Sequence, residues 1–395
     1  MKSNQRGMMG SMWTQSLRSL LPWFLRLSFG VFLFRGFAEP VTAVPLYPPQ
    51  RVISQKPQVC VHTRLIDEVY EGVIQRSLQM VREMGADTIV EFFPWAYAEP
   101  SKGQYDWSNF DRIVKHARNQ GLHIIARMGL VPGWARPEVE VANSTLNTLP
   151  AESYDDFAYF VSQFAGRYAG VIDQIIIWNE PNLAFEWGFQ QVDPIGYVRL
   201  LQAVYEPIHA ANPNAKVLAA PLAPTLEPPG SPNGLNDLLY LEALYEAGMQ
   251  GHYDAMAMHT YGFTEPPEAP PSTRALNFRR AELLHEIMTR YGDGDLPVYI
   301  TETGWNDHPR WTKAVRPSLR VQYTIGAFRW AETYWPWAEK VCIWAFRYPA
   351  PTNNYPDNFT LVNGDFQPRP IYTAIQNFAL GRSTEEALWL PAPSG

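Results

Sequence analysis

Residues Gln174–Pro181 read QIIIWNEP, and this stretch decides the fold predicted for the chain. Three consecutive isoleucines without polar alternation are typical of a strand that is buried on both faces, as the strands of parallel sheets are. Pro181 ends the strand, because proline has no backbone N–H to donate and pushes the preceding residue away from helical geometry. Asn179 and Glu180 are therefore expected side by side at the carboxyl end of a buried strand. A carboxylate in that position costs folding free energy, so we interpret Glu180 as a candidate functional residue.

On both sides of this stretch, apolar segments that suit strands alternate with segments of helical periodicity. Strands are expected at residues 58–62, 88–92, 122–126, 174–178, 216–219, 253–258, 297–301 and 341–346. Helices are expected at residues 73–84, 110–117, 154–168, 197–211, 236–247, 275–291, 317–335 and 371–380. Eight strand–helix pairs in succession are the pattern of the α/β class and predict a single (β/α)8 barrel, or TIM barrel.

The lengths of the predicted loops indicate which end of the barrel carries the active site. Links from a helix to the next strand are short, whereas the strand-to-helix links at residues 221–235, 262–273 and 347–370 are long and rich in proline. Barrels of this kind place their active sites at the carboxyl ends of the strands, among such loops. The alternative is that the prolines only stiffen the loops.

The composition excludes several classes of protein. The 395 residues are 46% hydrophobic and 18% charged, which is typical of a folded globular chain. The net charge is −7 and no basic block occurs, so we expect no nucleic-acid partner. Only two cysteines occur, Cys60 and Cys342, which excludes a disulfide-built scaffold, and no Cys/His spacing indicates a zinc site. Each cysteine lies in an apolar strand-like run, so both are expected to be buried free thiols.

The first 38 residues differ in kind from the rest. Three basic residues precede an apolar run at residues 20–34, and Gly36–Ala38 is a small-x-small cleavage candidate. We expect an export signal. The alternatives are a retained membrane anchor, which Arg26 in the middle of the run disfavours, and a non-targeting extension.

The remaining boundaries follow from this organisation. Residues 39–56 are expected to be a proline-rich linker, residues 57–381 the catalytic barrel and residues 382–395 a C-terminal tail. Such a chain is expected to be secreted, or tethered to a membrane with the barrel outside the cytoplasm.

A second apolar strand also ends in a glutamate. Residues Val298–Trp305 read VYITETGW, which places Glu302 at the carboxyl end of the seventh predicted strand. In a closed barrel the ends of strands four and seven face each other across the opening, so Glu180 and Glu302 are expected to be neighbours. A retaining glycosidase needs two carboxyl groups about 5–5.5 Å apart, one protonated to serve the leaving oxygen and one ionised to attack the anomeric carbon. This chemistry requires neither a metal nor an organic cofactor.

At these residues the chain resembles clan A of the glycoside hydrolases, and within it looks most similar to families 39 and 5. The likeness rests on Trp178–Pro181 together with Glu302. Residues Trp95–Trp107 (WAYAEPSKGQYDW) and Leu361–Pro370 (LVNGDFQPRP) extend it, so that it covers roughly residues 57–381.

The resemblance implies roles for individual residues. Glu180 would be the acid/base and Glu302 the nucleophile. Asn179 would bind the 2-hydroxyl of the sugar, Tyr261 would hold the nucleophile through its hydroxyl, and Trp344 would form the floor of the subsite next to the cleaved bond. For Tyr261 and Trp344 the alternative is ordinary packing at the rim of the barrel.

His259 and three tryptophans on predicted loops are weaker candidates for the substrate site. A hydrogen-bonded structural histidine would explain His259 equally well. Trp134, Trp187 and Trp305 would offer aromatic faces to sugar rings, but large aromatic residues on loops are often only packed.

The predicted function is a retaining glycoside hydrolase acting on a β-linked poly- or oligosaccharide. Family 39 xylosidases carry an additional β-sandwich domain for which 395 residues leave no room, so we expect an open cleft and internal cleavage. Two alternatives stay open: a non-catalytic barrel that binds glycans, and a metal-dependent barrel hydrolase, which clustered His and Asp ligands would indicate.

Overall fold

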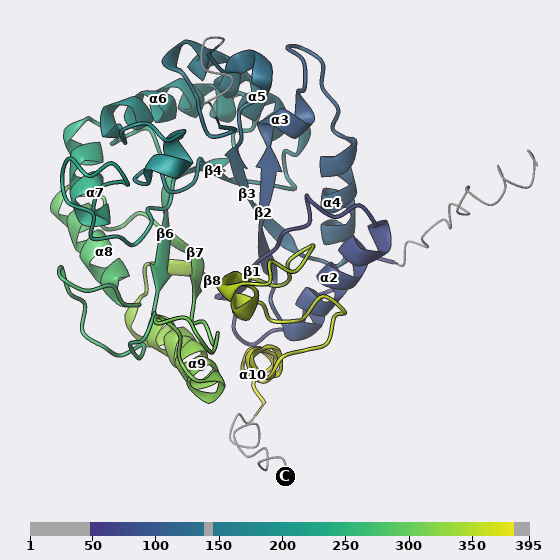
Figure 1. The fold of residues 1–395 in the computed structure, drawn as a ribbon. Helices are drawn as coiled ribbons and strands as arrows, with labels where there is room; N and C mark the ends of the chain where they lie inside the picture. Colours follow the sequence, from purple (N-terminus) through teal and green to yellow (C-terminus); the bar gives the residue numbers. More distant parts are fainter. Residues whose placement is uncertain (1–47, 138–144, 383–395) are drawn as a thin grey trace, which may run out of the picture. The chain divides into compact units, whose positions relative to one another are not determined.

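The computed structural model describes residues 48–137 and 145–382, and within this part the strands close into a barrel. All eight strands are parallel and neighbour one another in sequence order, with β8 pairing back onto β1 (Figure 1). They are β1 (Val59–His62), β2 (Thr88–Pro94), β3 (His123–Gly129), β4 (Gln174–Ile177), β5 (Lys216–Ala219), β6 (Ala255–Tyr261), β7 (Val298–Gly304) and β8 (Ala338–Ile343). The predicted TIM barrel is confirmed.

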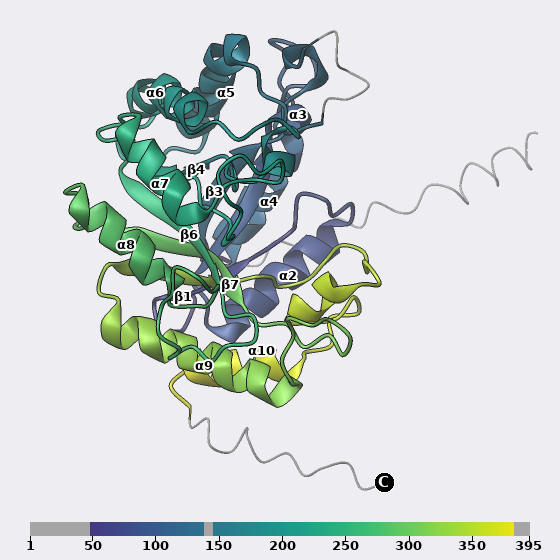
Figure 2. The same cartoon turned by 60° about the vertical axis from the view of Figure 1, so that its left-hand side comes forward.

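The helices lie outside the ring of strands, as both views of the molecule show (Figures 1 and 2). They are α2 (Glu71–Met84), α3 (Trp95–Ala98), α4 (Ser108–Asn119), α5 (Tyr154–Arg167), α6 (Pro194–Ala211), α7 (Asp237–Glu246), α8 (Arg280–Arg290), α9 (Pro317–Tyr334) and α10 (Pro370–Ala379). Three of them begin with proline, which suits a first turn because its missing N–H has no partner there in any case. In the described residues, no helix combines the length and the apolar character that crossing a membrane requires.

The barrel has two apolar layers, as the alternation of side chains along a strand requires. The larger layer lies between the strands and the helices. The smaller fills the inside of the barrel with one or two residues from each strand: Cys60, Val90, Ile125, Ile176, Leu218, Ala255, Ala257, Tyr299 and Cys342. The inside of the barrel is therefore packed with apolar and aromatic side chains below its opening.

The two cysteines of the inner layer are joined to each other. Cys60 and Cys342 are directly opposite in the register of β1 and β8, and they form a disulfide between residues 282 positions apart. Both are fully buried. The expectation of two free thiols was wrong, because only closure of the barrel brings the first and last strands together, and neither cysteine's local sequence carries that information.

Several strands extend further toward the opening than expected. The pairing of β2 with β3 continues to Pro94 and Gly129, and β6 and β7 run to Tyr261 and Gly304. Polar and aromatic residues near the strand ends interrupt the apolar pattern, but their backbone still pairs with the neighbouring strand. Arg127 is therefore a residue of β3 rather than of a loop.

Part of the predicted domain plan lies outside the described residues. This is so for the expected signal or anchor at residues 1–38, for residues 39–47 of the expected linker and for residues 383–395 of the tail. Residues 48–56 run along the lower end of the barrel, where the N–H groups of Gln50 and Gln55 donate to the carbonyls of Asn119 and Ala379. Contacts with the barrel thus begin before residue 57.

Candidate active site

The residues that line the opening of the barrel can be identified by stepping along the strands from the inner apolar layer. A side chain two positions further along a strand points to the same side, and the next inward positions here carry polar or aromatic groups. From Cys60, Ile125, Ala257 and Cys342 this step leads to His62, Arg127, His259 and Trp344. Their contacts agree: His62 meets the edge of the Trp344 ring at 4.5 Å, and His62, Arg127 and His259 all reach Glu302.

Glu302 enters this ring of residues through an irregularity in β7. Strict alternation from the inward Tyr299 would point Thr301 inward and Glu302 outward. The register of β7 shifts against β8 between Ile300 and Thr303, and against β6 next to His259. Such irregularities re-aim side chains. The result is that Glu302 faces the inside of the barrel, directly opposite His259 in the register.

Glu180 is held by an unusual backbone just beyond the end of β4. Trp178 and Glu180 have φ angles of 80° and 40°, in the left-handed region that residues other than glycine seldom adopt. Each such residue costs about 1–3 kcal/mol and persists where the surroundings over-determine it. Here the Glu180 N–H donates to the Pro221 carbonyl at 3.0 Å, and its carbonyl accepts from Leu183 N–H at 2.9 Å. Part of the backbone strain after β4 therefore falls on the candidate catalytic residue.

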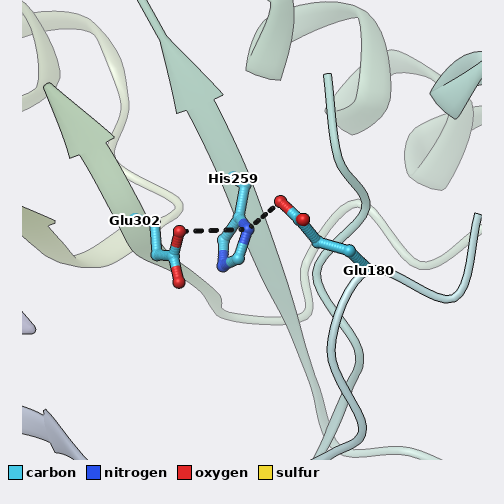
Figure 3. Close-up of side chains that lie close together, drawn as sticks. All are labelled: Glu180, His259 and Glu302. Atoms are coloured by element: carbon cyan, nitrogen blue, oxygen red, sulfur yellow. Dashed lines mark hydrogen bonds and ion pairs between the residues drawn. The ribbon is translucent and has the colours of Figure 1, made fainter. Parts of the chain in front are cut away.

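The two glutamates meet beside His259 (Figure 3). Nδ1 of His259 lies 2.7 Å from Glu180 Oε1 and 3.7 Å from Glu302 Oε2. One oxygen of each carboxyl group and one nitrogen of His259 all lie within 4.8 Å of one another. The Tyr261 hydroxyl donates to Glu302 Oε2 at 2.8 Å. The structure therefore brings together two acids that lie far apart in the sequence.

The environments of the two acids separate their roles. Burial raises the pKa of Glu180 to about 7, which the positive charge of Arg127 offsets only in part. Burial also raises the pKa of Glu302, but Glu302 accepts hydrogen bonds from Tyr261 and, at 3.5 Å, from Arg127 Nη1, and both favour its ionised form. Near neutral pH the shared proton therefore belongs on Glu180 and the negative charge on Glu302.

The two histidines of the opening are neutral at this pH. Burial lowers the pKa of His259 to about 4 and holds that of His62 well below its usual range. Nδ1 of His62 is 2.8 Å from the Thr63 carbonyl and must carry the proton, which leaves Nε2 as an acceptor. This Nε2 is buried, has no hydrogen-bond partner among the described residues, and lies 3.7 Å from Glu302 Oε1. Two acceptors cannot bond to each other, so His62 Nε2 needs a donor from elsewhere, such as a ligand hydroxyl group.

Most of the residues expected at the site are found around the acid pair. Asn179 Oδ1 accepts a hydrogen bond from Arg127 Nη1 at 2.8 Å. The Trp344 indole N–H donates to the Tyr348 hydroxyl at 3.0 Å, while the ring stands against His62. With Tyr261 and His259 in contact with the glutamates, these positions are compatible with the roles expected of them.

The tryptophans expected on loops lie elsewhere. Trp305 is 1% exposed, and its ring lies where a side chain on Gly262 would have to be, with its N–H bonded to the Glu265 carbonyl. It supports the β6–α8 loop and offers no free face, so the expected contact with a sugar is not possible in this structure. Trp187 is buried too. Trp134 is half-buried, packs edge-on against Trp95 and donates to the Glu99 carbonyl.

Three residues near the pair were not anticipated as site residues: His62, Arg127 and Glu186. The first two could have been found by stepping two positions on from Cys60 and Ile125. Glu186 lies in the 3-10 helix η4 (Ala184–Trp187) after β4, and no periodicity marks it.

The same cluster could in geometric terms hold a divalent cation. Glu180, His259 and Glu302 supply three suitable donor atoms, the number used by catalytic zinc sites. The sequence showed no clustered ligands of this kind, because His259 and Glu302 come from β6 and β7 and Glu180 from the segment after β4. The alternative of a metal-dependent hydrolase therefore needs an experimental test.

Comparisons with known proteins agree with the barrel fold. The family model of the β-galactosidases of glycoside hydrolase family 42 matches residues 66–142. A probable β-galactosidase C of Sclerotinia sclerotiorum is 38% identical over 55 residues, or 13% of this chain and 6% of the relative. A family 39 glycoside hydrolase from Bacteroides cellulosilyticus WH2 matches with a TM-score of 0.64 at 21% identity, over 84% of this chain and 65% of that one. A monomeric β-xylosidase from Caulobacter crescentus CB15 matches with a TM-score of 0.59 at 18% identity, over 83% of this chain and 69% of that one.

The barrel shares its fold with solved structures of glycoside hydrolases. The expected resemblance to family 39 is confirmed for the fold, and the family 42 match includes the predicted clan A stretch Trp95–Trp107. This chain spans 65% of the length of the Bacteroides enzyme and a small part of the β-galactosidase. The solved structures therefore show the fold, and the β-galactosidase likeness is confined to part of the chain.

Proposed function

We propose that this protein is a retaining glycoside hydrolase that cleaves β-linked poly- or oligosaccharides by double displacement. The observation that carries the proposal is the approach of Glu180 and Glu302, with one oxygen of each inside a group of atoms no more than 4.8 Å apart. Inverting enzymes hold their carboxyl groups about 6.5–9.5 Å apart to leave room for a water, and retaining ones about 5–5.5 Å. The short separation favours retention.

In the first step Glu180 and Glu302 act on the same bond. Glu180 gives its proton to the glycosidic oxygen while the bond from that oxygen to the anomeric carbon breaks, and the leaving sugar departs as an alcohol. The ionised carboxylate of Glu302 attacks the anomeric carbon and forms an ester. Tyr261 holds the attacking group, since its hydroxyl is bonded to Glu302 Oε2.

In the second step the ester is hydrolysed. The carboxylate of Glu180 takes a proton from a water, whose oxygen attacks the anomeric carbon, and Glu302 leaves as a carboxylate. The product has the configuration of the substrate, and Glu180 is protonated again. His259, in contact with both acids, is placed to keep their orientation through both steps.

Side chains at the opening of the barrel are placed to contact a sugar. The buried Nε2 of His62 needs a donor, and a sugar hydroxyl between it and Glu302 would supply one. Asn179 lies beside the acid pair and Trp344 presents a ring next to His62. These residues support a site for a neutral sugar ring with several free hydroxyls.

The test is a screen of aryl β-glycosides, starting with galactosides and xylosides because those names occur among the similar proteins, followed by β-glucan, mannan and xylan. Glu180→Gln and Glu302→Gln should each abolish turnover while the protein stays folded. Proton NMR of the first product formed should show the β-anomer. Turnover that yields the α-anomer first would refute the double displacement.

The same screen separates the alternatives. A barrel that only binds glycans would show binding and no turnover with any substrate. A metal-dependent hydrolase would lose activity after dialysis against a chelator and regain it with zinc or manganese. The two-carboxylate mechanism predicts unchanged activity after chelation.

We also propose that the barrel works outside the cytoplasm. Two features support this: the signal-like residues 1–38 and the disulfide between Cys60 and Cys342, a type of bond that persists mainly in oxidising compartments. Cell fractionation with N-terminal sequencing of the mature protein tests the proposal.

A further inference from the structure

A cavity of about 160 Å³ lies beside the acid pair, between the upper ends of β2, β3 and β4. Its walls include Phe92, Arg127, Asn147, Asn179 and Glu186. Two of these residues also belong to the acid site, since Arg127 Nη1 bonds to Asn179 and reaches Glu302. The cavity and the acid pair therefore share a wall, and the mechanism described above makes no use of the rest of the cavity.

Glu186 is a third acid in this small region. Burial, and then the nearby charge of Glu180, raise the pKa of Glu186 to about 7, while Arg127 and the amides of Asn179 and Asn147 lower it in part. Burying a carboxyl group beside another acid costs folding free energy, and groups with such raised pKa values cluster at functional sites. Glu186 is six residues after Glu180 in the chain, so the β4–α6 loop (residues 178–193) carries both.

The protein leaves Glu186 only partly hydrogen-bonded. Asn147 Nδ2 donates to its Oε2 at 3.1 Å. Asn179 is the other partner, and because Asn179 Oδ1 accepts from Arg127, its amide N–H group is the one that faces Glu186. A carboxylate has about four acceptor positions, so two amides leave acceptor capacity on a residue that lines the cavity.

The rest of the cavity is suited to a sugar rather than to an apolar group. Arg127 has a buried Nε with no hydrogen-bond partner among the described residues, and its guanidinium lies 4.6 Å from the centre of the Phe92 ring. The volume equals roughly five water molecules at about 30 Å³ each, which is room for a hydroxyl-bearing part of one sugar ring. A ligand must bring donors for Glu186 and can also accept from Arg127. Sugar hydroxyl groups do both.

We infer that Glu186 is a specificity-determining residue, which accepts hydrogen bonds from hydroxyl groups of the sugar held in this cavity. The inference rests on the proposed function for its substrate class. It adds to that function a requirement: the sugar next to the acid pair must carry free hydroxyls where it meets Glu186. A competing explanation is that Glu186 only ties the β3–α5 loop to the β4–α6 loop through Asn147. That tie does not need an acid, because a glutamine would serve as well.

The kinetic test compares Glu186→Ala and Glu186→Gln with the wild type on the aryl β-glycoside that is cleaved fastest. Glu186→Ala should lower kcat/KM about 10- to 100-fold, the usual effect of losing a hydrogen bond to a charged group, and mainly through KM. Glu186→Gln should lower kcat/KM as well, but by a smaller factor than Glu186→Ala. On the monodeoxy analogue that lacks the contacted hydroxyl, wild type and Glu186→Ala should be equal. Glu152→Ala, which removes an exposed carboxylate from the β3–α5 loop, is the matched control and should behave as wild type.

A binding test keeps this inference separate from the proposed function. Isothermal titration calorimetry measures the contact between Glu186 and the sugar without turnover. The ligands are the sugar of the best aryl glycoside and its monodeoxy forms, and the proteins are Glu302→Gln and the double variant that also carries Glu186→Ala. Normal cleavage with no effect of Glu186→Ala on KM, or equal losses on all deoxy analogues, would overturn the inference while the proposed function stands. Sugar binding that depends on Glu186 without any cleavage would overturn the proposed function and support the inference. If no sugar binds and none is cleaved, both are wrong.

Discussion

The raised pKa of Glu180 should make this catalytic residue a measurable burden on the stability of the barrel. The group ionises near pH 4.5 in its usual state and near pH 7 in the folded protein. Between these values the folded state binds more protons than the unfolded state, so the free energy of unfolding falls as pH rises across that window. At about 1.4 kcal/mol per pKa unit, roughly 3 kcal/mol is lost by the time Glu180 is fully ionised.

Glu180→Gln removes this ionisation and should therefore gain stability relative to wild type as pH rises from 4.5 to 8. All other groups titrate in both proteins and cancel in the difference, except that Glu302 and Glu186 also lose a repulsive neighbour, which acts in the same direction. Glu180→Gln also weakens the contact with His259, but this lowers the free energy of unfolding by the same amount at every pH. The free energy of unfolding of Glu180→Gln minus that of wild type should therefore rise by about 3 kcal/mol over this pH range. This corresponds to about 4 °C in Tm, given an unfolding entropy of roughly 2 cal/mol/K per residue.

The assay is urea denaturation at several pH values between 4.5 and 8.5, followed by tryptophan fluorescence and checked by scanning calorimetry. Glu152→Gln, at an exposed position, is the control and should show no gap that depends on pH. If the free energy of unfolding of Glu180→Gln minus that of wild type stays constant or falls from pH 4.5 to 8.5, the reasoning is refuted. In that case Glu180 does not hold a proton near neutral pH, and its role as the acid fails with it.

Three further predictions concern the site and the barrel. The rate with a slow-leaving aryl β-glycoside should fall as pH rises through about 7, where Glu180 loses its proton; a pH–rate profile that stays level to pH 9 contradicts this. Tyr261→Phe removes the hydroxyl that bonds Glu302 and should lower kcat about 10- to 100-fold, with Tm within a few degrees of wild type; unchanged kcat would show that the hydroxyl is dispensable. Changing both Cys60 and Cys342 to serine should lower the free energy of unfolding by about 2–5 kcal/mol, because the bond closes a very long loop; equal denaturation midpoints would mean that the bond adds no stability.

The barrel and its acid pair could be predicted because each depends on local patterns. Eight apolar runs separated by helical periodicity imply a closed parallel sheet, and Glu180 and Glu302 each follow such a run directly. Once the strands are counted, geometry places their ends together. The neighbouring positions of the two strand ends could therefore be predicted, whereas the inward direction of the Glu302 side chain depends on the register shift in β7.

What the sequence concealed depends on how strands register and close. Arg127 interrupts the apolar pattern of β3, so the strand was expected to end before it, although alternation from Ile125 points it at Glu302. The disulfide joins residues that only barrel closure brings together. Trp305 follows a strand end, as catalytic residues do, but its ring packs beneath a loop instead of facing the opening.

The bond between β1 and β8 turns the catalytic part of the chain into a covalent ring. A protease cut in any loop of the described chain between Cys60 and Cys342, for example within the β6–α8 loop, would leave both pieces attached to each other. Such a nicked molecule should migrate as one species on a gel without reductant and as two with it. The same ring makes that loop a natural place to open new chain ends by circular permutation, since the old first and last strands would remain fastened side by side.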